Sequence, residues 1–266
     1  MGRPRLSEKI RRLIVRMVKE NPTWGQERVA AELSLKLGIS VSPRTVRASG
    51  LRGVLRRESE EPVRNVGGIF VRNHSQSIVA CDFLVSITAS FRVLYVLVVM
   101  EVVTRRILNS NVTAHPTAQW TLQQFREAIP SEHAYRFLIR DRDSIFSEEV
   151  DRDLKGFGLK ILRTPIQAPK ANAYCERLVG TMRRECLDWL IPLNEKHLRG
   201  ILREWVTRYN RGRAHASLGP GIPEPTKNPS LCAECRRHEL PEGCQIKTKD
   251  ILGGLHHEYW LEKMAA

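Results

Sequence analysis

The feature of this sequence that most limits its fold is an aspartate inside an apolar run. Residues 78–83 read Ile-Val-Ala-Cys-Asp-Phe, which is short and nearly continuous in apolar residues, as in a buried strand. A carboxylate at Asp82 is costly in such a strand unless a cation or hydrogen bonds compensate its charge. We therefore expect a buried sheet that brings a partner to this side chain.

Further elements follow this run in an order that predicts a mixed sheet. Their apolar spacing and capping residues separate strands from helices. The expected strands, in chain order, are 78–83, 94–99, 106–112, 135–140 and 159–163. The expected helices are 117–128, one that Ser147 caps, and 172–189. Three successive strands, followed by strands that alternate with helices, predict an α/β fold with a mixed five-stranded sheet and flanking helices.

The first 55 residues have a helical pattern instead. The first helix follows Ser7 and has apolar residues at helical spacing: Ile10, Leu13, Ile14, Met17 and Val18. A second helix over 25–37 leads through Gly38 to a short third helix, which Ser42 caps and which carries Arg44 and Arg47. This order is typical of a helix-turn-helix whose last helix enters the DNA major groove. A three-helix docking module without DNA contact is the open alternative.

The charge balance favours a polyanionic partner. The 266 residues include 43 Lys and Arg against 29 Asp and Glu, a formal net charge of +14. Such an excess attracts nucleic acid, although a basic protein without this partner stays possible on charge alone. The longest apolar run, 93–103, is too short to cross a bilayer as a helix. We expect a cytoplasmic protein without membrane contact.

Three acidic residues stand where the expected strands end or the last helix begins. Asp82 lies in the first strand, Asp141 follows the strand 135–140, and Glu176 lies in the first turns of the helix 172–189. Carboxylates brought together from separate elements can hold hard cations. Their spacing alone does not establish such a site, because acidic triples are common in a chain of this length.

Three other acidic residues have a structural interpretation. Glu101 stands beside Arg105 and Arg106, which favours an ion pair. Glu185 and Asp188 are interpreted as solvated helix charges.

Six segments carry a resemblance to a known family. Residues 78–83 (IVACDF), 140–146 (RDRDSIF) and 168–177 (APKANAYCER) resemble the three catalytic blocks of the integrase core. This core is the ribonuclease-H-like domain of retroviral integrases and bacterial insertion-sequence transposases. Residues 209–218 (YNRGRAHASL) resemble the tail motif of the bacterial branch, and residues 21–25 with 41–46 resemble its N-terminal helix-turn-helix.

The resemblance implies a DDE transposase or integrase. Such enzymes cut DNA at the transposon end and join the freed 3′-hydroxyl to target DNA. It assigns Asp82, Asp141 and Glu176 as ligands of two Mg²⁺ or Mn²⁺ ions. Asp143 stands where the family has Gly after its second acid, so Asp143 is the alternative second ligand. Joining two ends of double-stranded DNA implies a homodimer or a larger assembly on the DNA.

Basic residues near these segments are candidate DNA contacts, although each can also be a solvated charge. The candidates are Lys170, Arg177, Arg183 and Arg184 beside the acids, with Arg44 and Arg47 in the third N-terminal helix. Gly180 can allow close approach of a DNA backbone, and Asn172 can cap the last helix. Packing is the expected role of three tail-motif residues, Tyr209, Arg213 and His215.

The cysteines give a weaker signal. Cys232, Cys235 and Cys244 leave a zinc site open, although the regular second half of a zinc motif is missing. Cys81 and Cys175 flank the acids and are expected to fill space as small apolar side chains.

The expected domains are a helix-turn-helix module at 1–55, a linker at 56–76, a catalytic core at 77–225 and a small C-terminal element at 226–266. Two alternatives remain at this point. One is a catalytically inactive or truncated relic that only binds DNA, and the other is a ribonuclease-H-type nuclease. Metal-dependent nicking of a transposon-end DNA separates the active transposase from the relic.

Overall fold

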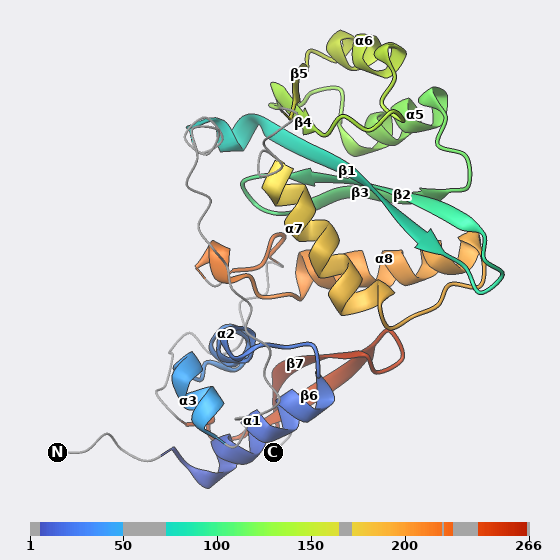
Figure 1. Cartoon of the computed structure of the whole chain (residues 1–266). Coiled ribbons are helices and arrows are strands. Elements are labelled where there is room, and N and C mark those ends of the chain that lie inside the picture. The colour runs from blue at the N-terminus through green and yellow to red at the C-terminus, as the bar shows by residue number, and fades with distance from the viewer. Residues whose placement is uncertain (1–5, 50–72, 165–171, 220, 226–238, 265–266) are drawn as a thin grey trace. The chain divides into compact units, whose positions relative to one another are not determined.

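The computed structural model describes residues 6–49, 73–164, 172–219, 221–225 and 239–264 (Figure 1). The chain divides into two compact units. The first unit combines both ends of the chain, residues 1–60 and 207–266, and the second contains residues 61–206.

A five-stranded mixed sheet forms the centre of the second unit (Figure 1). Its strands are β1 (Ile78–Ile87), β2 (Val93–Glu101), β3 (Ile107–Thr113), β4 (Phe137–Arg140) and β5 (Lys160–Arg163). The first three pair antiparallel, and β4 and β5 continue in parallel from the other side of β1, in the order β3-β2-β1-β4-β5. This is the order of a ribonuclease-H-like sheet, so the predicted fold class is confirmed.

Helices α5 (Ala118–Ala128) and α6 (Glu148–Gly156) pack on one face of this sheet. Phe125 and Leu154 from these helices share an apolar core with Val79 and Cys81 of β1. Successive side chains of a strand point to opposite faces. Asp82 therefore points away from the face that α5 and α6 cover.

Two further helices follow β5. α7 (Ala173–Met182) packs on β1 and runs into a π-helical turn over Arg183–Leu187. α8 (Glu195–Arg211) reaches β3, where the guanidinium of Arg199 donates a hydrogen bond to the carbonyl of Val112 at 2.8 Å. The single helix expected over 172–189 is thus a shorter α-helix that ends in a wider turn.

Three helices open the first unit, as the sequence predicted. α1 (Glu8–Glu20) follows Ser7, and α2 (Gln26–Leu37) ends at Gly38, whose φ of 66° is the left-handed conformation that glycine adopts readily. α3 (Pro43–Ala48) follows Ser42, whose hydroxyl accepts a hydrogen bond from the amide of Thr45 at 3.2 Å. With six residues, α3 is short, as the sequence analysis expected.

A C-terminal β-hairpin completes the core of these helices. Its strands are β6 (Cys244–Ile251) and β7 (His256–Lys263), which pair antiparallel. Tyr259 and Leu261 are buried in one apolar cluster with the inner face of α1 and with Trp24. The sequence predicted only a small terminal element here and gave no sign that it packs on the N-terminal helices.

Hydrogen bonds fix Tyr259 in this core. Its hydroxyl donates a hydrogen bond to the carboxylate of Glu20 at 2.7 Å and accepts one from the side-chain amide of Asn21 at 2.8 Å. Its ring meets the ring of Trp24 edge-on, with the centroids 6.1 Å apart. Burying a tyrosine is favourable only if its hydroxyl has hydrogen-bond partners, and residues at the end of α1 supply them here.

The tail motif packs within the same unit. Tyr209, Arg213 and His215 are all less than a tenth exposed. The rings of Tyr209 and His215 meet edge-on at 4.7 Å, and the guanidinium of Arg213 lies 3.2 Å from the Nδ1 atom of His215. The expectation that these residues pack is confirmed.

A buried carboxylate joins α2 to the tail motif. Glu32 is 1% exposed and lies 3.2 Å from the ammonium of Lys36 and 3.6 Å from the guanidinium of Arg28. Its carboxylate also accepts a hydrogen bond from the amide of Ala214 at 3.4 Å. Burial alone would raise the pKa of Glu32, but the surrounding cations lower it below its ordinary value.

Some predictions fall on residues outside the described ranges. The expected linker lies there as far as residue 72, and so do Cys232 and Cys235. Cys244 is a free thiol at the start of β6. Within the described ranges, no helix is long and apolar enough to cross a membrane.

The shared core predicts that the hairpin stabilises the N-terminal helices. Tyr259→Ala removes a large buried ring and should cost about 3–5 kcal/mol of unfolding free energy in this unit. Trp260→Ala, on the 41% exposed side chain next to it, is the control and should cost less than about 1 kcal/mol. Amide hydrogen exchange should then show lost protection in α1 and α2 for Tyr259→Ala only. Unchanged protection in both helices would contradict a common core.

Candidate active site

Asp82 and Asp141 stand side by side because β1 and β4 pair in parallel. Val79 is opposite Leu138 and Ala80 is opposite Ile139. Continued for two more residues, this register aligns Asp82 with Asp141, which directly follows the end of β4. Neighbouring strands lie about 4.8 Å apart, so the two carboxylates start from adjacent backbone positions.

Glu176 comes to the same region on α7. The residue before this helix, Asn172, donates a hydrogen bond from its side-chain amide to the carbonyl of Cys81 at 3.1 Å. This bond ties the start of α7 to the β1 backbone next to Asp82. Glu176 follows Asn172 by four residues, about one helical turn. Asn172 is the N-cap residue of α7, as expected, but its side chain makes no capping hydrogen bond and holds the helix to the strand instead.

The charges of the three acids act on one another. Burial, followed by the charges of Asp141 and Glu176, raises the pKa of Asp82 to about 7. Burial and the charge of Asp141 also raise the pKa of Glu176, whose side chain is exposed. Asp141 therefore acts on both of the other acids, as expected for carboxylates that converge on one place.

Asp143 has a more local role. Its carboxylate accepts a hydrogen bond from the amide of Ile145 at 3.0 Å and so closes the turn after β4. Its amide donates to the carboxylate of Asp141 at 3.1 Å, which orients Asp141. The charge of Asp143 is the smallest of the three that raise the pKa of Asp82.

A buried ion pair that the sequence analysis missed supports the end of β4. Arg140 is 2% exposed and makes two hydrogen bonds of 2.7 Å to the carboxylate of Asp151 on α6. It also donates to the carbonyl of Asp141 at 2.7 Å, and Arg163 pairs with the same Asp151. Burial would raise the pKa of Asp151, but the bonds from Arg140 and Arg163 lower it. In the sequence, the position of Arg140 at the end of an apolar strand was the signal that could have indicated this ion pair.

The donor set fits a hard divalent cation in kind. All three side chains offer carboxylate oxygens, the ligands that Mg²⁺ and Mn²⁺ prefer. Burial first, and then the charges of neighbouring carboxylates, raise the pKa of Asp82 and of Glu176, and a bound cation would favour the ionised form of both. No group of three or more His, Cys, Asp or Glu within the described ranges is close enough to hold a metal ion. Binding one here therefore requires the carboxylates to move closer together.

The candidate DNA contacts divide between the units. Arg177, Arg183 and Arg184 are exposed on α7 and the turn that follows it. Arg183 also donates to the carbonyl of Val85 at 3.3 Å, so it lies along β1. Arg44 and Arg47 are exposed on α3 in the first unit, and Lys170 lies outside the described residues.

Gly180 makes room for an arginine of its own helix. A Cβ atom added there would lie 3.0 Å from a guanidinium nitrogen of Arg184. The side chain of Arg184 therefore lies over Gly180, where the sequence analysis suggested that a DNA backbone could approach.

The structure also shows the surroundings of two other acidic residues, Glu185 and Glu101. Glu185 is 3% exposed, so the interpretation of this residue as a solvated helix charge is wrong. Glu101 accepts hydrogen bonds from the hydroxyls of Tyr135, at 3.0 Å, and Thr104.

The two cysteines beside the acids are buried thiols. Cys81 and Cys175 are both fully buried. Burial raises the pKa of each thiol well above its ordinary value, so both stay protonated at neutral pH. The expectation that they fill space is confirmed.

Comparison with solved structures gives distant likenesses to catalytic cores. The HTLV-2 integrase catalytic core domain in complex with magnesium has 14% identity, covers 55% of this chain and 92% of that chain, and gives a TM-score of 0.43. The BIV integrase catalytic core domain has 14% identity, coverages of 56% and 91%, and a TM-score of 0.40. The Mos1 transposase catalytic domain, solved with Raltegravir and Mg, has 13% identity, coverages of 53% and 78%, and a TM-score of 0.45. No protein of curated function matches this sequence.

A family model gives the direct sequence match. The model described as the integrase core domain matches residues 157–223. This stretch holds β5, α7, α8 and the tail motif, and it includes Glu176. The match supports the resemblance found in the sequence for this stretch, which is similar to the integrase core domain.

Proposed function

We propose that this protein is a DDE transposase that cuts DNA at transposon ends and joins the freed strand to target DNA. The observation that supports the proposal is that Asp82 in β1, Asp141 at the end of β4 and Glu176 in the first turn of α7 lie close enough for the charges of Asp141 and Glu176 to act on Asp82. Each comes from a different element, and burial, followed by the charges of Asp141 and Glu176, raises the pKa of Asp82 to about 7. A carboxylate that is partly buried beside two like charges costs stability, which suggests a functional reason for keeping it.

In this proposal the three acids hold two Mg²⁺ or Mn²⁺ ions. When bound, such ions activate a water or a 3′-hydroxyl and neutralise the charge on the leaving oxygen. Asp141 is favoured over Asp143 as the second ligand, because its charge acts on both Asp82 and Glu176. Asp143 instead donates its amide to Asp141 and closes the turn.

In this proposal the basic residues of both units bind DNA. Arg177, Arg183 and Arg184 are exposed on the element that carries Glu176 and can contact phosphates next to the cut. Arg44 and Arg47 are exposed on α3, whose position after α2 and the Gly38 turn suits the recognition helix of a helix-turn-helix. Because two transposon ends must be joined together, at least two copies of the chain are expected on the DNA.

Loss of the carboxylate of Asp82 or of Glu176 should abolish strand transfer but not DNA binding. Asp82→Asn and Glu176→Gln keep the size of the side chain and remove its charge, so strand transfer should fall by about 10³-fold or more. The measurement is strand transfer on a duplex with the repeats that flank this gene, in Mg²⁺ or Mn²⁺, with binding measured in parallel. Asp153→Asn, at an exposed acid of α6, is the matched control and should keep full activity.

The same assay decides between the alternatives. Full activity of Glu176→Gln would remove Glu176 from the site. A wild-type protein that binds the repeats without cutting them would be the inactive relic. Loss of activity in Asp143→Asn, with Asp141→Asn active, would make Asp143 the second ligand.

The raised pKa of Asp82 predicts a stability change that needs no activity. Its pKa of about 7 lies above the ordinary value near 4, so the stability that this group gives at low pH is lost as the pH rises toward and through 7. Without metal at pH 8, Asp82→Asn should therefore stabilise the sheet unit by on the order of 2 kcal/mol, after allowing for partial solvent exposure. This gain should fade toward pH 4.

Metal addition provides the second half of this test. Mg²⁺ should raise the unfolding temperature of the wild type and have little effect on Asp82→Asn, because the variant has lost a ligand. Thermal unfolding at pH 5 and pH 8, with EDTA or with Mg²⁺, measures both effects. An equal shift in wild type and variant would show that Asp82 does not bind the ion.

A further inference from the structure

The outer face of α1 carries two parallel rows of side chains at four-residue spacing. The inner face of this helix is apolar and buried, from Ile10 to Val18. The first outer row consists of Glu8, Arg12, Arg16 and Glu20. The second consists of Arg11, Val15 and Lys19. Residues four apart lie next to each other on a helix, so each row forms a continuous ridge.

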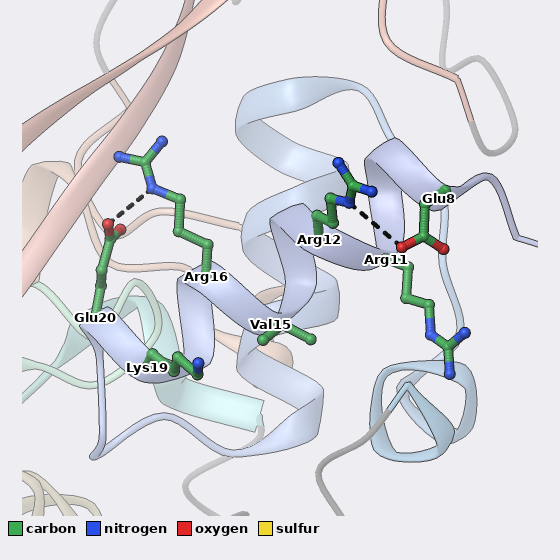
Figure 2. Close-up of a pocket in the computed structure, with 7 residues that line it drawn as sticks. All are labelled: Glu8, Arg11, Arg12, Val15, Arg16, Lys19 and Glu20. Carbon is green, nitrogen blue, oxygen red and sulfur yellow. Dashed lines mark hydrogen bonds and ion pairs between the residues drawn. The ribbon is translucent and has the colours of Figure 1, made fainter.

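The first row neutralises itself. The guanidinium of Arg12 lies 3.3 Å from the carboxylate of Glu8, and that of Arg16 lies 2.7 Å from Glu20 (Figure 2). Glu20 is also bound by the hydroxyl of Tyr259. Burial would raise the pKa of Glu20, but the bonds from Arg16 and Tyr259 lower it. The row thus ends in a carboxylate that stays ionised and keeps Arg16 engaged.

The second row has no such compensation. Arg11 and Lys19 are both exposed, and neither has a carboxylate partner among the residues that the structure describes. Figure 2 shows the side chain of Arg11 extending away from Arg12 and Arg16, on the side of the helix where Lys19 also lies. Val15 stands between them and is partly exposed. This ridge therefore presents two uncompensated positive charges.

A cavity of about 500 Å³ is lined by residues of both rows (Figure 2). Its lining contains four bases and two acids around Val15, and both acids are already paired with arginines. The charge left over in the lining is positive. An anionic partner therefore fits this surface better than a neutral or a cationic partner does.

We propose that α1 binds the sugar–phosphate backbone of double-stranded DNA through Arg11 and Lys19, as a contact separate from that of α3. This inference rests on the proposed function, in which the first unit binds DNA. Eight residues separate the two cations, about 12 Å along the helix axis. That span is close to the width of the major groove, about 12 Å, so each cation can reach a phosphate on a different strand.

Contacts of this type are independent of base sequence and depend on salt. Each phosphate contact that is lost should lower the slope of log affinity against log salt by about 0.9. Arg11→Gln with Lys19→Gln should therefore reduce the slope by about 2. The affinity should fall equally for a duplex with the flanking repeats and for a scrambled duplex of the same length. Loss of base contacts from α3 would instead weaken only the specific duplex.

The experiment uses the full chain and a charge-matched control. Lys249→Gln with Lys263→Gln removes two exposed positive charges from the hairpin of the same unit. Glutamine is nearly as good a helix former as arginine and lysine, so the α1 variant should fold, which its thermal unfolding checks. DNA affinity of wild type and both double variants is measured on both duplexes at several salt concentrations.

Support requires the slope to fall for the α1 variant and to stay near the wild-type value for the hairpin variant. An equal fall in both variants would mean that only the total charge matters and would overturn the proposal. An unchanged α1 variant would also overturn it and would leave this face for a partner other than DNA. Both of these failures differ from failure of the proposed function, which would appear as a wild-type protein without strand transfer.

Discussion

The parallel pairing of β1 with β4 is the interaction on which the candidate site depends. It places Asp82 and Asp141 at adjacent, partly buried positions, where burial of Asp82 and the charge of Asp141 both raise the pKa of Asp82. The surrounding structure holds this arrangement in place. Arg140 fixes the end of β4 through Asp151, and Asn172 ties α7 to β1. The fold thus maintains a concentration of negative charge that suits a divalent cation.

The first unit solves a different problem, the closure of a small core. Three short helices bury few apolar side chains, and small domains of this size are marginally stable. Here the C-terminal hairpin adds Tyr259 and Leu261 to the same cluster, and the tail motif adds the contact between Ala214 and Glu32. Segments from both ends of the chain are therefore needed to build the unit that presents α1 and α3.

Local patterns in the sequence were sufficient for much of this structure. The apolar run around Asp82, the caps at Ser7 and Ser42, and the turn at Gly38 each depend on neighbouring residues, and the corresponding elements are present. The order of strands and helices was sufficient for the fold class, because short connections allow few arrangements. The candidate acids came from the resemblance of their flanking segments to the integrase core, which the family match supports for the block around Glu176.

Long-range contacts were decided only by the tertiary structure. The sequence by itself determined the strands, the helices and the acids that stand at their ends, because these depend on residues close together in the chain. It did not determine that Tyr259 packs against α1, that Glu32 meets the tail motif, or that Arg140 pairs with Asp151. Two of these contacts join residues more than 180 positions apart, and none leaves a periodic signal. Burial of a polar group is acceptable only where the fold brings its partner, so the structure alone shows which of these side chains face inward.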